Sequence, residues 1–454
     1  MIDPASISTD MLLDDLRQLV ELPGALEQRE ELAAVASRLA TLMRQRGLQT
    51  EIMETSGAPV VIGRRAGRSP FTLLLYHHYD TSPSGPWRAW HHDPFQLAER
   101  DGALFGRGVA HGKGPLVAHL AGIASLLERG GELPCGVLIV AEGEGLGGSA
   151  HLNTVVSGLR SHTHVDACLS TGGERGPDGR PLCYSGAKGM LQLRLTSTAA
   201  NQPLPIGLAA SVPNPLWRML WALNHIKNDQ EEILIKDFYN DVEGPSRSEN
   251  QAIRSVQLDE AGRLAAWGLN EFLFSASGAT LVRAEALLPT CNISSLAVEP
   301  HGEFPAIPVA ASARLDFQLV PDQRPHAILD LLYEHLAAKG LGDIEIERLP
   351  GGYHAAHTPF DHPYIKQVRD AGQLIYGAPL DRLPLGSFAQ PLAAFVDAFG
   401  IPMACVGCAR PDSALNGPNE HIPLDDLVRH AQLLVELLSI CAAGAQVVSA
   451  AASD

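Results

Sequence analysis

Histidine and acidic side chains follow two strongly apolar runs, and these positions are where the sequence could support chemistry. His78 and Asp80 follow the run FTLLLYH, and Glu142 and Glu144 follow the run GVLIVA. Because residues two apart on a strand point to the same face, Asp80 can orient and polarise the imidazole of His78. A histidine held in this way can act as a general base or as a metal ligand.

Three further stretches carry polar groups among glycines. His111 and Lys113 lie in GRGVAHGKG, Glu174 ends STGGE, and Asn416 begins NGPNE. Each has an ordinary structural explanation, since carboxylates at strand ends are well solvated and glycines are common in turns and helix caps. A functional interpretation therefore depends on several stretches agreeing in order and spacing.

The elements that would position these groups form an α/β layer. Phe71 to Asp80 has the pattern of a buried parallel strand whose carboxyl end opens into a site, and 136–144 is similar. Helical spacing of apolar residues predicts helices over 12–20, 32–43 and 113–131. Alternating strands and helices imply a sheet with helices on both faces.

The middle of the chain follows a different order. Its pattern predicts strand, helix, strand, strand, helix and strand, which is the ferredoxin-like arrangement. These elements are expected at 190–198, 214–226, 290–299, 306–321, 324–340 and 343–350.

The α/β pattern returns after His357. We therefore predict a discontinuous catalytic-type α/β domain, 1–187 and 353–454, with a second domain inserted at 188–352. A polar insertion at about 228–286 interrupts the inserted domain, and the sequence does not indicate its role.

Composition excludes some partners. The net charge of −17 argues against nucleic-acid binding, because phosphate contacts need clustered Lys and Arg. We find no secretory signal and no run approaching the roughly 18 apolar residues of a membrane span, so we expect no membrane partner. Seven scattered cysteines favour a reduced, cytoplasmic setting.

Four motifs occur in a recognisable order: HHYD at His77, GRGVAHGKG at Gly106, EGEGLGGS at Glu142 and NGPNE at Asn416. With FYNDVEGPSRSE and LVPDQRP in the middle of the chain, this set resembles the two-zinc exopeptidase and amidohydrolase family. That family includes carnosine dipeptidase, aminoacylase, acetylornithine deacetylase, succinyl-diaminopimelate desuccinylase and glutamate carboxypeptidase. The resemblance implies a zinc-exopeptidase-like catalytic domain, with a mixed sheet, and an inserted ferredoxin-like α+β lid that forms a homodimer.

The resemblance also implies five metal ligands and a catalytic glutamate, most of which this chain lacks. His78 is retained, with Asp80 as the residue that orients it. The bridging aspartate is replaced by His111, and an imidazole cannot readily bridge two metals because its two lone pairs point apart. The catalytic glutamate is Gly145, and the remaining ligand positions are Leu146, Thr171 and Asn416.

The inserted domain has lost family residues as well. Leu204 stands where the family has a histidine that reaches the substrate, and Gln318 stands where it has an arginine for the substrate carboxylate. Asn292 and Ser387 are retained. With Lys113 and Asn416, they are our predicted substrate-binding residues.

We predict no dinuclear zinc centre, because too few donors remain to compensate two dications. The preferred hypothesis is a remodelled enzyme that acts on an amide or acyl bond of a small amino-acid-like or peptide-like compound. His78, Asp80 and His111 would be its catalytic residues, with Glu144 joining them if the chain slips by one position.

Two alternatives stay open. One is a metal-dependent peptidase or deacylase, with a single zinc held by His78, His111 and Glu174 in the three-ligand arrangement of catalytic zinc. The other is a pseudoenzyme that binds a peptide-like ligand without catalysis.

Overall fold

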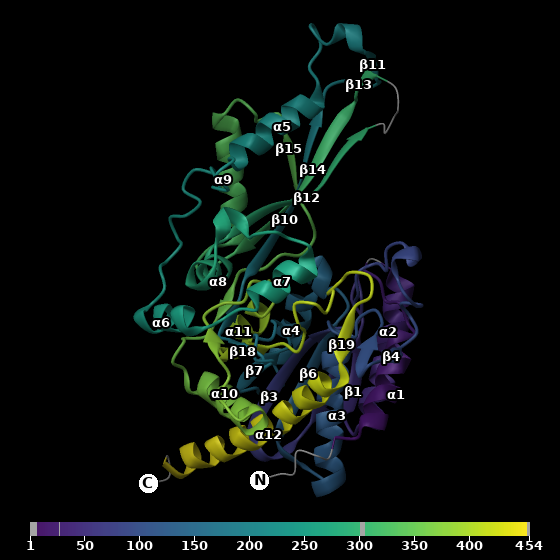
Figure 1. Ribbon diagram of the computed structural model, residues 1–454, viewed down its shortest axis with the longest axis vertical. Helices are drawn as coiled ribbons and strands as arrows, with labels where there is room; N and C mark the ends of the chain where they lie inside the picture. Colours follow the sequence, from purple (N-terminus) through teal and green to yellow (C-terminus); the bar gives the residue numbers. More distant parts are fainter. Residues whose placement is uncertain (1–6, 27, 300–304, 452–454) are drawn as a thin grey trace. The chain divides into compact units, whose positions relative to one another are not determined.

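The computed structural model describes residues 7–26, 28–299 and 305–451. The chain forms two compact units (Figure 1). Unit 1 contains Met1–Ala187, Pro245–Leu287 and Ala356–Asp454, and unit 2 contains Lys188–Gly244 and Leu288–Ala355.

Unit 1 is built on an eight-stranded mixed sheet in the order β1-β2-β6-β3-β7-β18-β8-β17. Its central strands β6, β3, β7 and β18 are parallel, and β1 and β2 are antiparallel at one edge. The strands are β1 (Gln49–Met53), β2 (Val60–Arg65), β3 (Gly67–His78), β6 (Leu133–Glu142), β7 (Ala167–Ser170), β8 (Cys183–Tyr184), β17 (Arg382–Leu383) and β18 (Met403–Val406).

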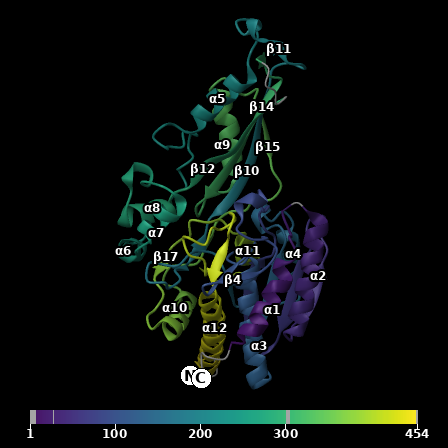
Figure 2. The same cartoon turned by 45° about the vertical axis from the view of Figure 1, so that its right-hand side comes forward.

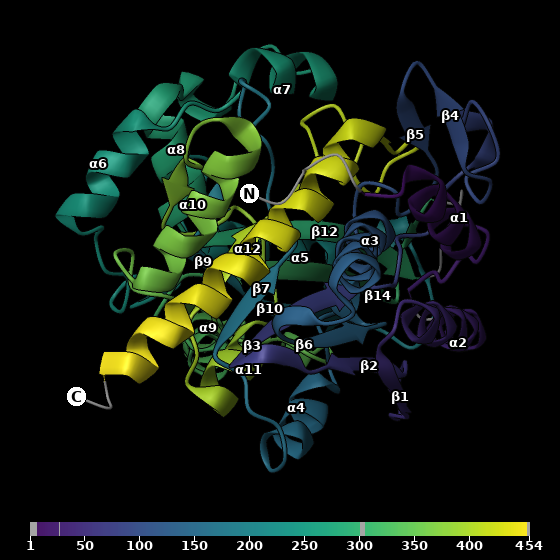
Figure 3. The same ribbon diagram turned by 90° about the horizontal axis from the view of Figure 1, so that it is seen from below.

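Helices cover both faces of this sheet, as predicted, because β3 is apolar on both sides. Leu73 and Leu75 pack into one core, while Leu74 and Tyr76 pack into the other. The first core is covered by α1 (Thr9–Val20), α2 (Arg29–Gln45), α3 (Lys113–Gly130), α10 (Pro363–Tyr376) and α12 (Leu424–Ala451), and α3 and α12 lie side by side in Figure 3. The second core is covered by α4 (Leu152–Arg160) and α11 (Ala393–Phe399).

Short elements complete unit 1. A small sheet joins β19 (His421–Pro423), β5 (Ala103–Phe105) and β4 (Ala98–Arg100), and β16 (Ala356–His357) pairs with β9 (Gly186–Ala187). The 3-10 turns are η2 (Trp87–Ala89), η3 (Gly145–Gly147) and η5 (Leu273–Ser275).

Helix α12 is long and apolar enough over Leu424–Gly444 to cross a membrane by length and composition. Half of the tested window is buried, and Leu427, Ala431 and Leu434 belong to the first core. We therefore regard α12 as a core helix of unit 1. The cytoplasmic location remains a prediction.

Unit 2 has the predicted βαββαβ order: β10 (Gly189–Thr198), α5 (Pro215–Ile226), β12 (Thr290–Glu299), β14 (Ala310–Leu319), α9 (Pro325–Ala338) and β15 (Glu345–Arg348). The strand order β12-β14-β10-β15 places the first strand between the third and fourth. Both helices pack on the sheet (Figure 2) and share one core with its strands. A short pair, β11 (Leu204–Pro205) and β13 (Ala306–Ile307), and the turn η4 (Ile206–Leu208) extend this unit.

The division differs from the predicted one in the middle of the chain. We predicted a single inserted domain at 188–352, but Pro245–Leu287 clusters with unit 1. This segment forms α6 (Arg247–Ser255), α7 (Glu260–Trp267) and α8 (Gly278–Leu287). Ile253, Leu281 and Val282 bury their side chains in the second core of unit 1. These few apolar residues among many polar ones gave too weak a pattern to place the segment.

The homodimer remains a prediction. Strand β12 is an edge strand that exposes Ile293 and Leu296, and α5 exposes Trp217 and Trp221. A second copy of unit 2 could cover these side chains, and sedimentation velocity would show whether it does.

Three histidines are buried together between β3, α3 and α12. His77 Nε2 lies 3.0 Å from His119 Nδ1, and the rings of His119 and His430 stack at 4.8 Å. His77 Nδ1, His119 Nε2 and both nitrogens of His430 have no hydrogen-bond partner among the described residues. Burial lowers the pKa of His119 to about 3, and burial and the neighbouring histidines lower the pKa of His77 and His430 well below the ordinary value.

We expect these histidines to make the protein sensitive to acid. Below pH 6.5, the ordinary histidine pKa, the unfolded chain binds protons that the folded protein does not, so the free energy of unfolding falls with pH. Each histidine contributes up to about 1.4 kcal/mol per pH unit. His430→Phe removes two unpartnered nitrogens. It should reduce the dependence of the unfolding free energy on pH by the contribution of about one proton.

Urea unfolding between pH 6.5 and about 5 measures the slope. The exposed His326→Phe is the control and should retain it. Comparing variants is necessary because Glu142, whose pKa burial raises to about 8, contributes an opposite slope. Identical slopes for His430→Phe and the wild type would contradict the prediction.

Candidate functional site

A cavity of about 300 Å³ lies in unit 1, where the parallel strands β3, β6 and β7 end. The sequence positions that correspond to the family ligands and catalytic glutamate all line it. They are His78, His111, Gly145, Leu146, Thr171 and Asn416. Five separate stretches of sequence therefore meet at one place, as their order and spacing suggested.

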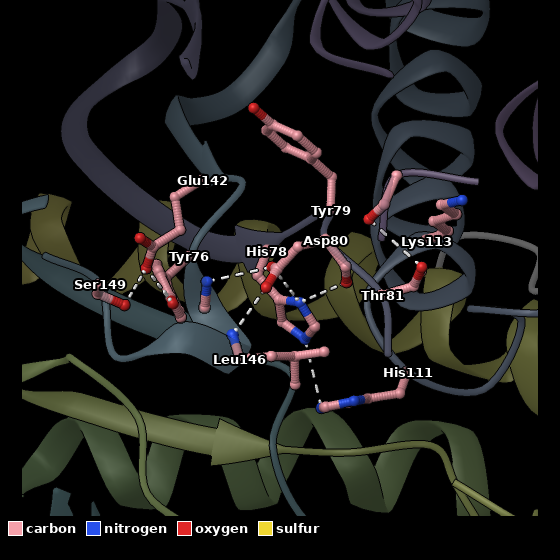
Figure 4. A network of polar contacts seen from close by, with 12 residues as sticks. Tyr76, His78, Tyr79, Asp80, Thr81, His111, Lys113, Glu142, Leu146 and Ser149 are labelled. Carbon is pink, nitrogen blue, oxygen red and sulfur yellow. Dashed lines mark hydrogen bonds and ion pairs between the residues drawn. The ribbon is translucent and has the colours of Figure 1, made fainter. Parts of the chain in front are cut away.

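At the centre of the site, Asp80, His78 and His111 form a chain of hydrogen bonds (Figure 4). His78 Nδ1 lies 3.0 Å from Asp80 Oδ1, and His78 Nε2 lies 3.3 Å from His111 Nε2. Asp80 is fully buried and His78 nearly so.

Hydrogen-bond donors and acceptors fix the protons in this chain when both histidines are neutral. Asp80 accepts the Nδ1–H of His78, so His78 Nε2 is an acceptor and His111 Nε2 must donate to it. His111 Nδ1 is then a bare lone pair with no partner within hydrogen-bond distance among the described residues, although the Asn416 side chain is close enough to His111 to act on its pKa. This nitrogen is itself buried, while His111 as a residue lines the cavity, so the ring has to shift before Nδ1 can act as a base on a ligand.

The electrostatics of the two histidines differ. Burial lowers the pKa of His78, but the hydrogen bond and charge of Asp80 outweigh it and raise the pKa above the ordinary value. Burial and the neighbouring His78 lower the pKa of His111 to about 3. A proton shared by the pair therefore resides on His78, beside the carboxylate.

Asp80 also holds the turn that follows β6. Its Oδ1 accepts the Gly145 N–H at 3.1 Å, and its Oδ2 accepts the Leu146 N–H at 2.8 Å. These contacts seat η3 against His78 so closely that a Cβ on Gly145 would lie 2.5 Å from the His78 Cβ. The position of the family glutamate therefore has no room for a side chain in this conformation.

A second buried carboxylate positions His111. Glu420 accepts hydrogen bonds from Arg107 Nη1 at 3.0 Å and from the N–H groups of Gly108, Ala110 and His111 at 3.0–3.2 Å. Arg107 and Glu420 are both about 1% exposed. These hydrogen bonds fix the loop before α3, and they therefore fix the position of His111 in the cavity.

A third carboxylate, Glu142, is a neutral acid at neutral pH. Burial raises its pKa to about 8, although Tyr76 and Ser149 donate hydrogen bonds to its Oε1 at 2.6 and 2.7 Å. Tyr76 also lines the cavity. Glu142, which does not line the cavity, thus positions the Tyr76 hydroxyl through a hydrogen bond.

Other predicted site residues are distributed unevenly. Ser387 and Asn416 line the cavity, but Asn292 lies exposed on β12 of unit 2. Glu144 contacts the His151 ring at 2.9 Å and the Ala58 N–H, away from the lining residues. Lys113, predicted to bind substrate, is buried and donates to the carbonyls of residues 22 and 23 at 2.5 and 3.1 Å, because it anchors α3 to the loop after α1.

The donor set does not fit a metal centre. No group of three or more His, Cys, Asp or Glu that could hold an ion occurs in the part of the chain that the structure describes. Both oxygens of Asp80 accept N–H groups, and Glu174, a predicted ligand of a single zinc, is paired with Arg263. His78 and His111 remain, with their Nε2 atoms 3.3 Å apart, and two ligands are fewer than the three that a catalytic zinc site takes from the protein.

Sequence reasoning missed two of these contacts, Arg107–Glu420 and Arg263–Glu174. Glu420 and Arg107 lie in the motifs NGPNE and GRGVAHGKG, so their positions could have suggested the ion pair between them. Arg263 lies in the polar segment whose role the sequence left open, and no local signal identified it as a partner of Glu174.

Comparisons with known proteins agree with this architecture. The model of Peptidase family M20/M25/M40 matches residues 74–440. Cys-Gly metallodipeptidase dug1 of Schizosaccharomyces pombe is 21% identical over 428 residues, covering 90% of this chain and 89% of that protein.

Solved structures show the same fold. The M20 family metallo-carboxypeptidase Sso-CP2 of Sulfolobus solfataricus has a TM-score of 0.89 and 26% identity, covering 95% of this chain and 99% of that one. Human carnosine dipeptidase 1 has a TM-score of 0.83 and 18% identity, covering 96% and 97%.

Restoring the family glutamate by Gly145→Glu should destabilise the protein rather than recreate a metal site. A Cβ there meets His78 at 2.5 Å, and overpacking of this kind costs about 1–3 kcal/mol. The control is Gly158→Ala in α4, where an added Cβ meets nothing within 4 Å. Urea unfolding measures both variants. A Gly145→Glu variant as stable as the wild type would show that the turn can open to accept a side chain.

Proposed function

The chain belongs to peptidase family M20/M25/M40, and we propose that it is a remodelled member that uses a histidine pair instead of a two-zinc centre. Its substrate would be a small amino-acid-like or peptide-like compound with an amide or acyl bond. The observation that carries this proposal is the chain from Asp80 through His78 to His111, a residue that lines the cavity and whose buried Nδ1 has no partner within hydrogen-bond distance among the described residues.

In the proposed reaction, His111 Nδ1 takes a proton from a water molecule as the water oxygen attacks the acyl carbon. The Nε2 proton of His111 moves to His78 Nε2 over the 3.3 Å contact. The positive charge then resides on His78, where the carboxylate of Asp80 stabilises it. Transfer back along the same chain delivers the proton to the leaving amine as the C–N bond breaks.

Neutral polar groups would orient the substrate. The hydroxyls of Thr171 and Ser387 and the amide of Asn416 line the same cavity and are suitable partners for a carbonyl group. Leu146 occupies a position where the family has a metal ligand, so it adds an apolar contact instead of a charge.

The alternatives predict different behaviour. A single-zinc hydrolase would need Glu174 to turn from Arg263 toward the two histidines. A binding protein would need only the cavity. The proposal predicts turnover that depends on both histidines and not on added metal.

We expect His111→Phe and Asp80→Asn each to lower kcat by about 10²–10⁴-fold, because one removes the base and the other the group that stabilises the relayed proton. The assay is a panel of dipeptides, N-acyl amino acids and amino amides, with product amines quantified by mass spectrometry. The exposed His162→Gln is the control and should retain full activity.

Treatment with a chelator separates the hypotheses further. Activity that survives chelation agrees with the histidine pair. Activity lost on chelation and restored by zinc would refute the proposal in favour of the single-metal alternative. Absence of turnover on the whole panel, with ligand binding intact, would favour a binding protein.

A further inference from the structure

The cavity has an unusual set of charges. Apart from the two histidines, Glu174 is the single charged residue among the described residues that line it, with no Lys or Arg. A carboxylate on an otherwise uncharged wall favours a cationic group on the ligand, and the lining offers no Lys or Arg to pair with a ligand carboxylate.

The segment Pro245–Leu287 holds this carboxylate in place. Arg263 of α7 donates to Glu174 Oε1 through Nη2 and to Oε2 through Nε at 3.3 Å, and its Nη1 lies 2.8 Å from Glu285 Oε1 of α8. The Arg263 guanidinium also lies over the Trp267 ring at 5.5 Å. These contacts fix the guanidinium from several sides.

Arg263, Glu174 and Glu285 form a triad with a net charge, and its members differ in how deeply they are buried. Two carboxylates surround one guanidinium, which leaves a formal charge of −1. The Arg263 side chain is 3% exposed, whereas Glu174 is 20% exposed and lines the cavity. A ligand therefore meets the carboxylate and not the arginine. Each carboxylate oxygen has a second lone pair, so Glu174 can accept from a ligand while it stays paired.

Aromatic rings flank the same wall. Tyr184 and Phe388 line the cavity and contact each other edge to face at 5.3 Å. Gly173 has a φ of +103° and passes so close to Tyr184 that a Cβ would lie 2.2 Å from the ring. This glycine lets the 172–174 turn bring Glu174 beside the aromatic surface, and ring faces attract cations.

We infer that the cavity selects a ligand with a free ammonium group and does not require a ligand carboxylate, and that the Pro245–Leu287 segment sets this selectivity through Arg263 and Glu285. The ligand class is an amino-acid amide or a related small primary amine. The inference rests on the proposed function only in using the same cavity as the substrate site.

The test compares two probes by calorimetry with the full chain: L-leucinamide, which has a free ammonium group, and N-acetyl-L-leucinamide, in which that group is a neutral and larger acetamide. We expect leucinamide to bind more tightly. Glu174→Gln should weaken leucinamide binding by about tenfold or more and leave the N-acetyl probe unchanged, because a charge-assisted hydrogen bond is lost. The control, Glu249→Gln, removes a carboxylate of α6 that lies near His357 and does not line the cavity, and it should change neither affinity.

Glu285→Gln provides a second variant if Glu174→Gln fails to fold. It keeps the Arg263–Glu174 pair and brings the triad to zero charge, so it should weaken leucinamide binding by a smaller factor. Equal affinity for the two probes, or no binding of leucinamide, overturns the inference. So does a charge preference that survives both Glu174→Gln and Glu285→Gln.

Equilibrium binding does not require turnover, so the two proposals can fail separately. Leucinamide binding that persists while catalysis proves independent of His111 would remove only the proposed reaction. Turnover that depends on His111 without a charge preference would remove only this inference.

Discussion

The site depends on the buried carboxylate of Asp80. It accepts one ring N–H from His78 and two backbone N–H groups from the η3 turn, at 2.8–3.1 Å. These three contacts set the tautomer of His78 and bring η3 against its ring, which closes the space that a side chain at Gly145 would need. Asp80 is thus a positioning residue for both the histidine and the turn. The same interaction therefore organises the histidine pair and closes the place of the family glutamate.

The other carboxyl groups in and near the cavity also have hydrogen-bond partners within the protein. Glu420 accepts from Arg107 and three backbone N–H groups, and Glu174 accepts from Arg263, whereas Glu142, a neutral acid, accepts from two hydroxyls. Buried charges persist only when they are paired or hydrogen-bonded, so these partners make the arrangement possible without an ion. The residues left for a ligand are a histidine nitrogen, neutral polar groups, aromatic rings and one partly exposed carboxylate.

Much of this organisation could be predicted from sequence. The strand 71–80 was expected to open into a site, and the family resemblance put His111 and Asn416 at ligand positions of that site. The structure places His78, His111 and Asn416 at one cavity. Lys113 and Glu144 could not be placed, because their partners are backbone carbonyls and a histidine that no motif marks. The role of the Pro245–Leu287 segment could not be predicted for a related reason. Its Arg263 pairs with Glu174, which lies 89 positions away in the sequence. Long-range pairs of this kind leave no periodic pattern.

The central claim is that the donors around His78 and His111 are too few, and too fully engaged, to hold a pair of cations. Elemental analysis of protein purified without chelator and equilibrated with zinc tests it most directly. The account predicts well under one zinc ion per chain, with no change in His78→Ala. About two zinc ions per chain, lost in His78→Ala and seen together in the cavity by anomalous diffraction, would contradict it.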